Sequence, residues 1–277
     1  MNFNKRLAGL PVLLVLVGCS NPIFIGDERV PVSDLSPAWS PSGQSIAFVH
    51  LHPSPSGTDR PGGLYLLDLA KRTQRLLTAE SAFNVSWSPD ETHLAFADAD
   101  GIHIIRADGD SLSTLYPQGG WPSWSRDGRS IVFAINGRLQ TLSIGDSIPV
   151  EITTANYFVR EPEVCPNGRE VVASVSGEIC RISLSDGGVH LLTSDDVEDR
   201  SPTCSSTGLI AWNRWSKGPE ICVMDSTGHD RRILASDESH MSWNPSGTCF
   251  VFSGSTPDGP RLFVMNADGS NLRKLTQ

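Results

Sequence analysis

One short motif recurs six times in this chain, about 40 residues apart, and this repeat restricts the fold more than any other feature. Its clearest copy reads Pro-Ala-Trp-Ser-Pro-Ser-Gly over residues 37–43, followed by Ile-Ala-Phe over 46–48. The tryptophan column of the motif falls at Trp39, Trp87, Trp124, Val164, Cys204 and Trp243. A unit of this length cannot bury its apolar face alone, so neighbouring units must stack. We therefore expect one architecture of six equivalent units.

Each repeat is typical of four short strands. The Pro-x-Trp-Ser stretch predicts a first strand, and the Pro-Asp/Ser-Gly that follows favours a tight turn, since proline presets φ and glycine accepts positive φ. Alternation over 46–48 predicts a half-buried second strand, and strands three and four follow at 64–67 and 76–78. The fold class that we expect is all-β, a six-bladed propeller of four-stranded antiparallel blades with almost no helix. Residues 274–276 should close the last blade, and residues 29–32 could add at an edge.

The repeats resemble a known family. The Trp-Ser-Pro-Asp/Ser-Gly turn with its Ile/Leu-Ala-Phe, together with Met-Asn-Ala-Asp-Gly at 265–269 and Lys-Leu-Thr at 274–276, looks like the WD-type repeats of TolB-like proteins. The resemblance covers residues 36–276 and implies the propeller fold. Because bacterial TolB carries a separate α/β domain ahead of its propeller and no segment here could supply one, we expect that domain to be absent.

The first residues are typical of a signal peptide. Lys5 and Arg6 precede an apolar stretch over residues 7–17, which is too short to span a bilayer as a helix. We therefore interpret residues 1–18 as a cleaved leader.

The end of this leader, Leu-Val-Gly-Cys at 16–19, resembles the lipobox of bacterial lipoproteins. That resemblance implies that Cys19 is diacylated, that cleavage occurs before it, and that its new amino group is acylated, which gives stable membrane attachment. Residues 19–35 would then form the lipidated start and a tether, and residues 36–277 the propeller. Ser20, in place of Asp, resembles the outer-membrane sorting choice, so we expect a lipid-anchored protein of the bacterial cell envelope, at the outer membrane facing the periplasm.

The charge of the chain restricts its partners. The sequence has 22 Lys and Arg against 31 Asp and Glu, a net charge of -9. An acidic body argues against nucleic acid and against direct adsorption on anionic lipid, because both require clustered basic residues. We expect a monomer that contacts the membrane only through its lipid and that binds an envelope protein or peptide.

The cysteines cannot all pair. Five remain after Cys19, an odd number in an exported chain, so at least one thiol should be free. Cys180 and Cys222 fall in the same third-strand column of adjacent blades, farther apart than a disulfide allows, and we expect them to pack. One inter-blade disulfide through Cys165 or Cys204 stays open. No Cys-x-x-Cys spacing exists, which argues against a structural zinc site.

Two apparent catalytic signals are weak. Residues 109–112 spell Gly-Asp-Ser-Leu, as in one esterase family, but they align with residues 269–272 and so belong to a routine turn. His50 and His52 could ligate a metal, yet no third ligand is identifiable. We assign no catalytic residue, no metal site and no cofactor, and leave calcium in the central tunnel as an open alternative.

The variable loops predict a binding face. In a four-stranded blade the loops between strands two and three and between blades lie at one end, and here these loops vary in length and chemistry. They carry aromatic and arginine side chains, the usual anchors of recognition surfaces. The candidate binding face comprises His50, His52, Arg60, Phe83, Trp121, Tyr157, Phe158, Arg160, Arg200, Arg214, Trp215 and His240. Glu161 and Asp199 lie nearby and predict a tunnel mouth of mixed charge.

Two functions are compatible with these patterns. The leading hypothesis is a non-catalytic, lipid-anchored envelope propeller that acts as a protein- or peptide-binding scaffold, because the blades use almost the whole chain. The alternative is a propeller enzyme, lactonase- or cyclase-like, with a metal or acid/base site at the tunnel mouth.

Overall fold

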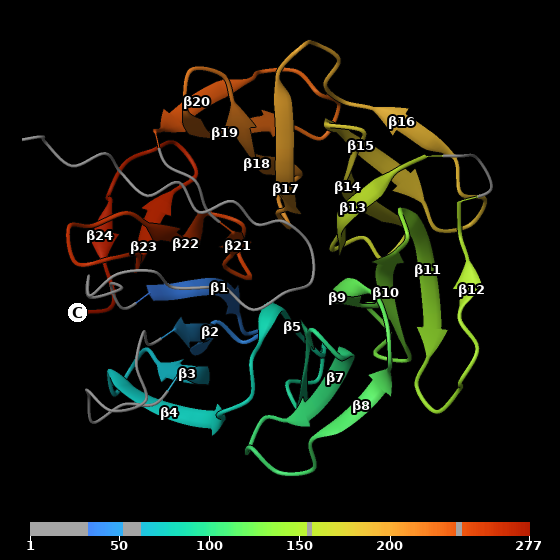
Figure 1. Cartoon of the computed structure of the whole chain (residues 1–277). Coiled ribbons are helices and arrows are strands. Elements are labelled where there is room, and N and C mark those ends of the chain that lie inside the picture. Colours follow the sequence, from blue (N-terminus) through green and yellow to red (C-terminus); the bar gives the residue numbers. More distant parts are fainter. Residues whose placement is uncertain (1–32, 52–61, 154–156, 237–239) are drawn as a thin grey trace, which may run out of the picture.

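The chain folds into a ring of six β-sheets. The computed structural model describes residues 33–51, 62–153, 157–236 and 240–277. These residues form six four-stranded antiparallel sheets, and no helix occurs among them, so none there could cross a membrane. Figure 1 shows the sheets arranged as blades around a central axis, with the first strand of each blade innermost. The predicted six-bladed, all-β propeller is confirmed.

Each blade consists of four strands that follow one another in the chain. Blade 1 contains β1 (Ser33–Trp39), β2 (Ser45–Leu51), β3 (Gly63–Asp68) and β4 (Thr73–Thr78), and blade 2 contains β5 (Phe83–Trp87), β6 (His93–Asp98), β7 (Gly101–Arg106) and β8 (Ser113–Tyr116). Blade 3 contains β9 (Gly120–Trp124), β10 (Ser130–Ile135), β11 (Arg138–Ser143) and β12 (Val150–Glu151), and blade 4 contains β13 (Val159–Val164), β14 (Glu170–Val175), β15 (Glu178–Ser183) and β16 (Val189–Leu191). Blade 5 contains β17 (Glu198–Cys204), β18 (Leu209–Trp215), β19 (Pro219–Asp225) and β20 (Arg232–Ala235), and blade 6 contains β21 (Met241–Trp243), β22 (Cys249–Gly254), β23 (Arg261–Asn266) and β24 (Arg273–Lys274).

The ring closes without exchange of a strand. The C-terminal β24 is the outer strand of blade 6, as the sequence predicts, and β1 is the inner strand of blade 1. Because β1 begins at Ser33, residues 33–35, which the motif left in the tether, belong to the first blade. Residues 1–32, including Cys19 and the edge candidate at 29–32, lie outside the described part of the chain.

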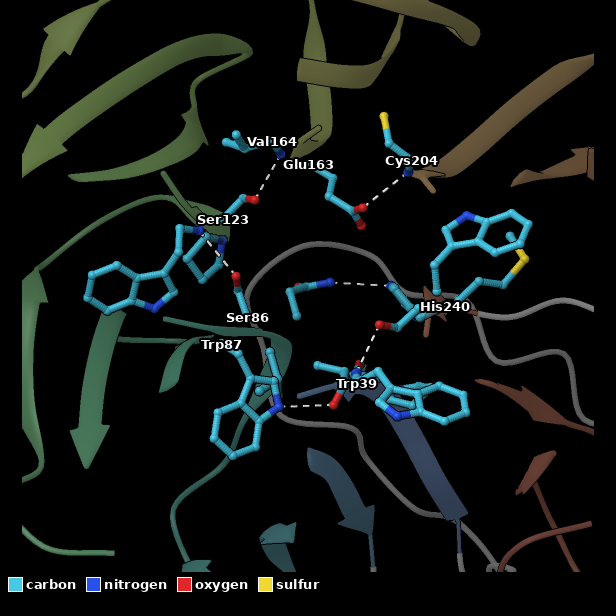
Figure 2. A pocket seen from close by; sticks show the side chains of 18 of the residues that line it. Trp39, Ser86, Trp87, Ser123, Glu163, Val164, Cys204 and His240 are labelled. Atoms are coloured by element: carbon cyan, nitrogen blue, oxygen red, sulfur yellow. Dashed lines mark hydrogen bonds between the residues drawn. The ribbon is translucent and has the colours of Figure 1, made fainter. Parts of the chain in front are cut away.

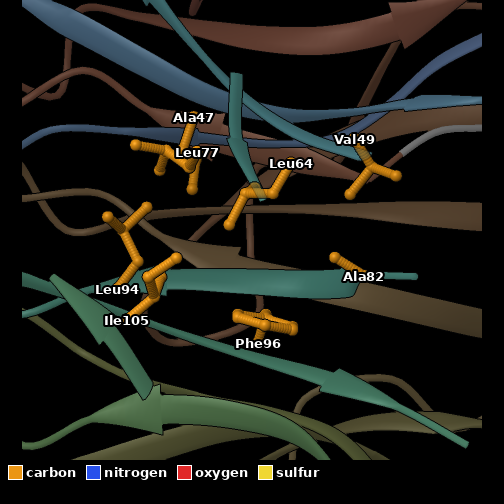
Figure 3. Close-up of a cluster of buried hydrophobic side chains, with 9 residues drawn as sticks. Ala47, Val49, Leu64, Leu77, Ala82, Leu94, Phe96 and Ile105 are labelled. Atoms are coloured by element: carbon orange, nitrogen blue, oxygen red, sulfur yellow. The ribbon is translucent and has the colours of Figure 1, made fainter. Parts of the chain in front are cut away.

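Apolar side chains from adjacent blades form one core cluster at each of the six interfaces. Ala47 and Val49 of β2 pack toward Phe96 of blade 2 (Figure 3), whereas Ile46 and Phe48 belong to the cluster shared with blade 6. The sequence predicts a half-buried β2, but all four side chains are buried. The reason is that a blade is covered on both faces by its neighbours, so both sides of the period-2 pattern are apolar.

The turn between the first two strands explains one departure from the repeat. Gly43 adopts φ +76, as the motif predicts, and its amide donates to the Ser40 carbonyl at 2.9 Å. In blade 2 this position is Glu91, which takes φ +59 despite its side chain. Its carboxylate accepts hydrogen bonds from the amide and hydroxyl of Ser42 in blade 1. The Glu91 side chain therefore joins two neighbouring turns, which glycine could not do.

A disulfide joins blades 4 and 5. Cys165 and Cys204 are bonded, with their α-carbons 5.3 Å apart and a sequence separation of 39. Cys204 stands in the tryptophan column, so this interface has a covalent bond where four of the other five interfaces have a packed indole. Cys180 and Cys222 are buried free thiols, as expected, and Cys249 is half-buried and free.

We expect the double substitution Cys165→Ala/Cys204→Ala to lower the free energy of unfolding by about 2 to 4 kcal/mol, because the bond closes a long loop in the unfolded chain. Chemical denaturation with and without reductant measures this. Reductant should destabilise the wild type and leave the double variant unchanged, and Cys249→Ser should behave as the wild type. Equal labelling of the wild type by maleimide under denaturing conditions, with and without prior reduction, would show that the bond is absent.

Candidate functional site

The six inner strands enclose a channel along the axis of the ring. Its cavity has a volume of about 290 Å³ and is lined by residues of all six blades (Figure 2). Five inner strands share one distortion, a residue with φ between +48 and +55 three positions before the tryptophan column. These residues are Ser36, Asn84, Trp121, Glu161 and Ser201, and His240 holds the sixth place. In each of these five strands the ladder register shifts at this bulge. The bulges bring five of these residues to one mouth of the channel, and His240, directly before β21, lines the same cavity.

A ring of mostly hydroxyl side chains follows just inside this mouth, and all of its members except Thr203 line the cavity. It occupies the position before the tryptophan column and consists of Ala38, Ser86, Ser123, Glu163, Thr203 and Ser242. Three of its hydroxyl oxygens accept a backbone N–H from the next blade around the ring. The bonds run from Trp124 N to Ser86 (3.1 Å), from Val164 N to Ser123 (2.9 Å) and from Trp39 N to Ser242 (2.9 Å). We call this set the axial ring, and it ties neighbouring blades together near the axis (Figure 2).

Indole groups bridge the interfaces where the axial ring does not. Trp87 Nε1 donates to the Ala38 carbonyl at 3.0 Å, where blade 1 has no hydroxyl, and Trp243 Nε1 donates to the Thr203 carbonyl at 3.2 Å. By contrast, the buried Nε1 atoms of Trp39 and Trp124 have no partner in the described residues, and both backbone amides bond to hydroxyls. Each tryptophan of the column therefore makes one axial bond to the preceding blade, either through its amide or through its indole.

Glu163 is the one carboxylate in the axial ring. Its Oε1 accepts from the Thr203 hydroxyl at 2.8 Å and from the Cys204 amide at 3.1 Å, which continues the pattern to blade 5. The side chain is half-buried, with one side on the channel. Burial raises the pKa of Glu163 to about 7, although its hydrogen bonds with Thr203 and Cys204 oppose the shift. Glu163 is therefore a group that titrates near neutral pH.

The mouth of the channel adds a second carboxylate and an imidazole. The backbone amide of Ser201 donates to Glu161 Oε2, and the Asn84 amide group lies 3.3 Å from His240 Nε2. Desolvation disfavours the charged imidazole and lowers the pKa of His240, and the nearby Glu161 carboxylate opposes that shift. The expected mixed-charge mouth thus contains Glu161 and His240, whereas Asp199 is fully buried and bonds to Arg214.

The structure divides the predicted binding face into several groups. Trp121 and His240 line the channel, and Phe83, Tyr157, Phe158 and Arg160 are exposed at the same end of the ring. His50 is buried with its Nδ1 2.7 Å from Asp34, and Arg214 bonds to Asp195 and Asp199. His52 and Arg60 lie outside the described residues. We name this end of the ring, with the starts of the inner strands, the loop face.

On the loop face, a groove of about 480 Å³ separates blades 4 and 5. Phe158, Arg160 and Arg200 line it, and the Arg160 guanidinium lies 4.7 Å from the centre of the Phe158 ring. Arg200 bonds to Glu198 and lies 6.0 Å from the Trp215 ring. The groove thus presents the Phe158 and Arg160 pair together with Arg200, and Trp215 lies next to Arg200 outside the lining; the sequence predicted all four residues.

Sequence reasoning missed the axial ring. Its signal was visible in the repeat alignment, where the position before the tryptophan column reads Ala, Ser, Ser, Glu, Thr and Ser. Within the described ranges, no group of three or more His, Cys, Asp or Glu side chains is placed to hold a metal ion.

Comparison with known proteins supports the fold. No family model matches the sequence, and no curated protein does. Among solved structures, TolB from Acinetobacter baumannii superposes with a TM-score of 0.65 at 16% identity, covering 89% of this chain and 63% of that chain. The resemblance to TolB-like propellers is thus confirmed at the level of the fold.

Propellers with other roles are similar too. An oligogalacturonate lyase in complex with manganese has a TM-score of 0.60 at 15% identity over 89% of this chain and 78% of that one. A chain of a nidogen/laminin complex has a TM-score of 0.64 at 11% identity, with coverages of 88% and 94%. The fold is therefore common to binding proteins and enzymes, and the function must be argued from the site.

The raised pKa of Glu163 predicts a pH-dependent stability. Between the unfolded pKa, 4.5, and the folded pKa, about 7, the folded state binds more protons, so this contribution to stability falls as the pH rises through that window. We expect Glu163→Gln, which keeps the acceptor oxygen, to have a free energy of unfolding higher than that of the wild type by on the order of 1 to 2 kcal/mol at about pH 8. At about pH 5 the two free energies should converge. Denaturant titrations at the two pH values measure both.

The exposed Glu80→Gln serves as the matched control and should track the wild type at both pH values. If Glu163→Gln differed from the wild type by the same amount at both pH values, the assigned titration would be wrong.

Proposed function

We propose that this protein is a non-catalytic, lipid-anchored propeller of the bacterial cell envelope that binds another protein or a peptide at its loop face. It acts as a monomer at the outer membrane, facing the periplasm. The leader and the lipobox-like segment ending at Cys19 support the anchor. The likeness to TolB and to a chain of a nidogen/laminin complex supports an extracytoplasmic, protein-binding role.

The observation that carries the binding proposal is the pairing of aromatic and arginine side chains around the groove. Phe158 is 49% exposed and Tyr157 is 38% exposed, which is high for aromatic side chains at the end of a packed blade. One side of the Phe158 ring packs closely against Gly137, where a Cβ would lie 2.5 Å from the ring. Rigid aromatic groups with adjacent guanidinium groups are typical of interface hot spots.

The anchor predicts a specific modification. Cells that express the wild type with an alkyne-labelled palmitate should yield labelled protein in the membrane fraction, and Cys19→Ser should abolish the label and release the protein. Cys249→Ser, a half-buried free thiol, is the control and should stay labelled. Unchanged labelling of Cys19→Ser would refute the anchor.

The loop face predicts a position-dependent crosslink. A photo-crosslinking amino acid at Tyr157 should capture a discrete partner in cells, and Phe158→Ala or Trp215→Ala in that background should lower the yield by about tenfold, as for a hot-spot residue. Ile233, 61% exposed on the outer strand β20, provides the matched control position. The same bands from both positions, or full yield from both alanine variants with wild-type melting temperatures, would contradict the proposal.

The second candidate is a propeller enzyme, lactonase- or cyclase-like, with its acid/base group in the channel. One observation favours it, the pKa of about 7 for Glu163 beside a second carboxylate, Glu161, in the same cavity. Turnover of a lactone or a uronate oligomer by the wild type, with loss in Glu163→Gln, would replace the scaffold by this enzyme.

A further inference from the structure

Glu163 has one more acceptor oxygen than the axial ring uses. At three other interfaces a serine hydroxyl accepts the backbone N–H of the next blade, and Glu163 does the same with Oε1 alone. Its Oε2 accepts no hydrogen bond from the residues that the structure describes. Figure 2 shows the carboxylate reaching into the space between the inner strands. One carboxylate oxygen is therefore available to a group in the channel.

Glu161 offers a second available oxygen two residues earlier on β13. Its Oε2 accepts from the Ser201 amide, and within the described chain Oε1 accepts none. The titratable or charged side chains that line the channel are Glu161, Glu163, His240 and Arg126. Arg126 is exposed in the turn after β9, at the opposite end, and among the described residues no Lys or Arg pairs with either carboxylate. The wall of blade 4 thus brings two carboxylates together, and the His240 imidazole is the basic group beside Glu161.

One hydroxyl of the axial ring, that of Ser123, has a proton without an acceptor among the described residues. Ser123 is 6% exposed, and its Oγ accepts from Val164 N, yet its own hydroxyl proton has no acceptor in the described part of the chain. A buried hydroxyl is rarely left without a partner, so the cavity is built for polar contents. A carboxylate removed from bulk water either takes up a proton or is offset by a cation.

The number of acceptors favours a small organic cation over a metal ion. Calcium takes six to eight oxygen ligands, whereas the channel supplies two available carboxylate oxygens and a few hydroxyls. A primary ammonium needs only about three acceptors, and it is compact. A cavity of about 290 Å³ suits one extended side chain rather than a larger ligand.

We propose that the channel binds the ε-ammonium of a lysine side chain from the partner, held between Glu161 and Glu163 at the wall of blade 4. The partner docks on the loop face, and the lysine enters the mouth past Asn84 and His240. This inference rests on the proposed function, since it names the chemistry of the partner that the loop face binds. The ammonium pairs with the ionised form of Glu163, so binding favours loss of the proton from this carboxyl group.

The direct test uses a small probe. Calorimetry should detect binding of Nα-acetyl-lysine methylamide to the purified wild type and no binding of the corresponding norleucine compound, which lacks the ammonium group. Glu163→Gln and Glu161→Gln should each weaken the lysine probe by about tenfold or more, as expected for a hydrogen bond to a charged group. Glu170→Gln, whose carboxylate pairs with Arg181 away from the channel, should bind as the wild type. Equal binding of both probes, or an undiminished affinity in Glu163→Gln, would overturn the site.

A pH series separates a charge effect from a change of shape. From about pH 8 to about pH 6 the wild type should lose roughly tenfold in affinity, because protonated Glu163 attracts no cation. The Glu163→Gln variant should lose much less, and any slope that it keeps belongs to His240, whose protonation also repels the probe. Identical slopes in the two proteins, both shown to be folded over this pH range, would overturn the assignment of Glu163. Displacement of the lysine probe by millimolar calcium chloride, with tighter binding of calcium, would overturn the choice of ammonium.

Failure of this inference differs from failure of the proposed function. If Tyr157 crosslinks a partner but neither lysine probe nor Glu163→Gln has an effect, the loop face binds a partner that does not use the channel. If the lysine probe binds and no crosslink forms, the ammonium site exists without a protein partner, and only the assignment to lysine in a partner is overturned.

Discussion

The contact between neighbouring blades near the axis is the constraint on which the rest of this structure depends. A four-stranded sheet with both faces apolar cannot exist alone, so each blade is stable only between two others. Near the axis the strands converge, and their bulges leave polar backbone groups that must be satisfied. The axial ring and the column tryptophans meet this need by two alternative bonds, as in Ser86 with Trp124 N and Trp87 Nε1 with Ala38.

The departures from the repeat gather at blades 4 and 5. Both blades lack the column tryptophan, the ring hydroxyl becomes Glu163, and the interface gains the Cys165–Cys204 disulfide. These changes depend on one another, because the amide of Cys204 donates to Glu163 and the disulfide fixes that amide. A covalent bond offsets the apolar packing lost with the indole, so the same interface can hold a carboxylate in a narrow channel. The groove with Phe158 and Arg200 lies at the loop-face end of this interface.

The repeat motif was sufficient to predict the blades, the order of strands and the closing strand β24, because each depends on a short local pattern. The motif could not predict the φ of +53 at Glu161 or its equivalents, since nothing in the residue type favours that conformation there. It misplaced His50, because a polar residue at the end of a strand suggests solvent, whereas the Asp34 carboxylate opposite it allows burial. Arg160 was predicted correctly as a surface residue, because it lies at the exposed start of β13, next to a variable loop.

A channel that serves only to close the ring would be expected to carry a hydroxyl in every blade, as serine meets the need at the lowest cost in desolvation. Glu163 instead keeps a carboxylate whose charged form is disfavoured by burial in the fold. Such a group lowers the stability of the empty protein near neutral pH and recovers that free energy when a cation arrives, so folding and binding are linked through one proton. The Cys165–Cys204 disulfide links the two blades beside this carboxylate, so the charge of Glu163 is offset within a closed interface, either by a proton or by the proposed cation.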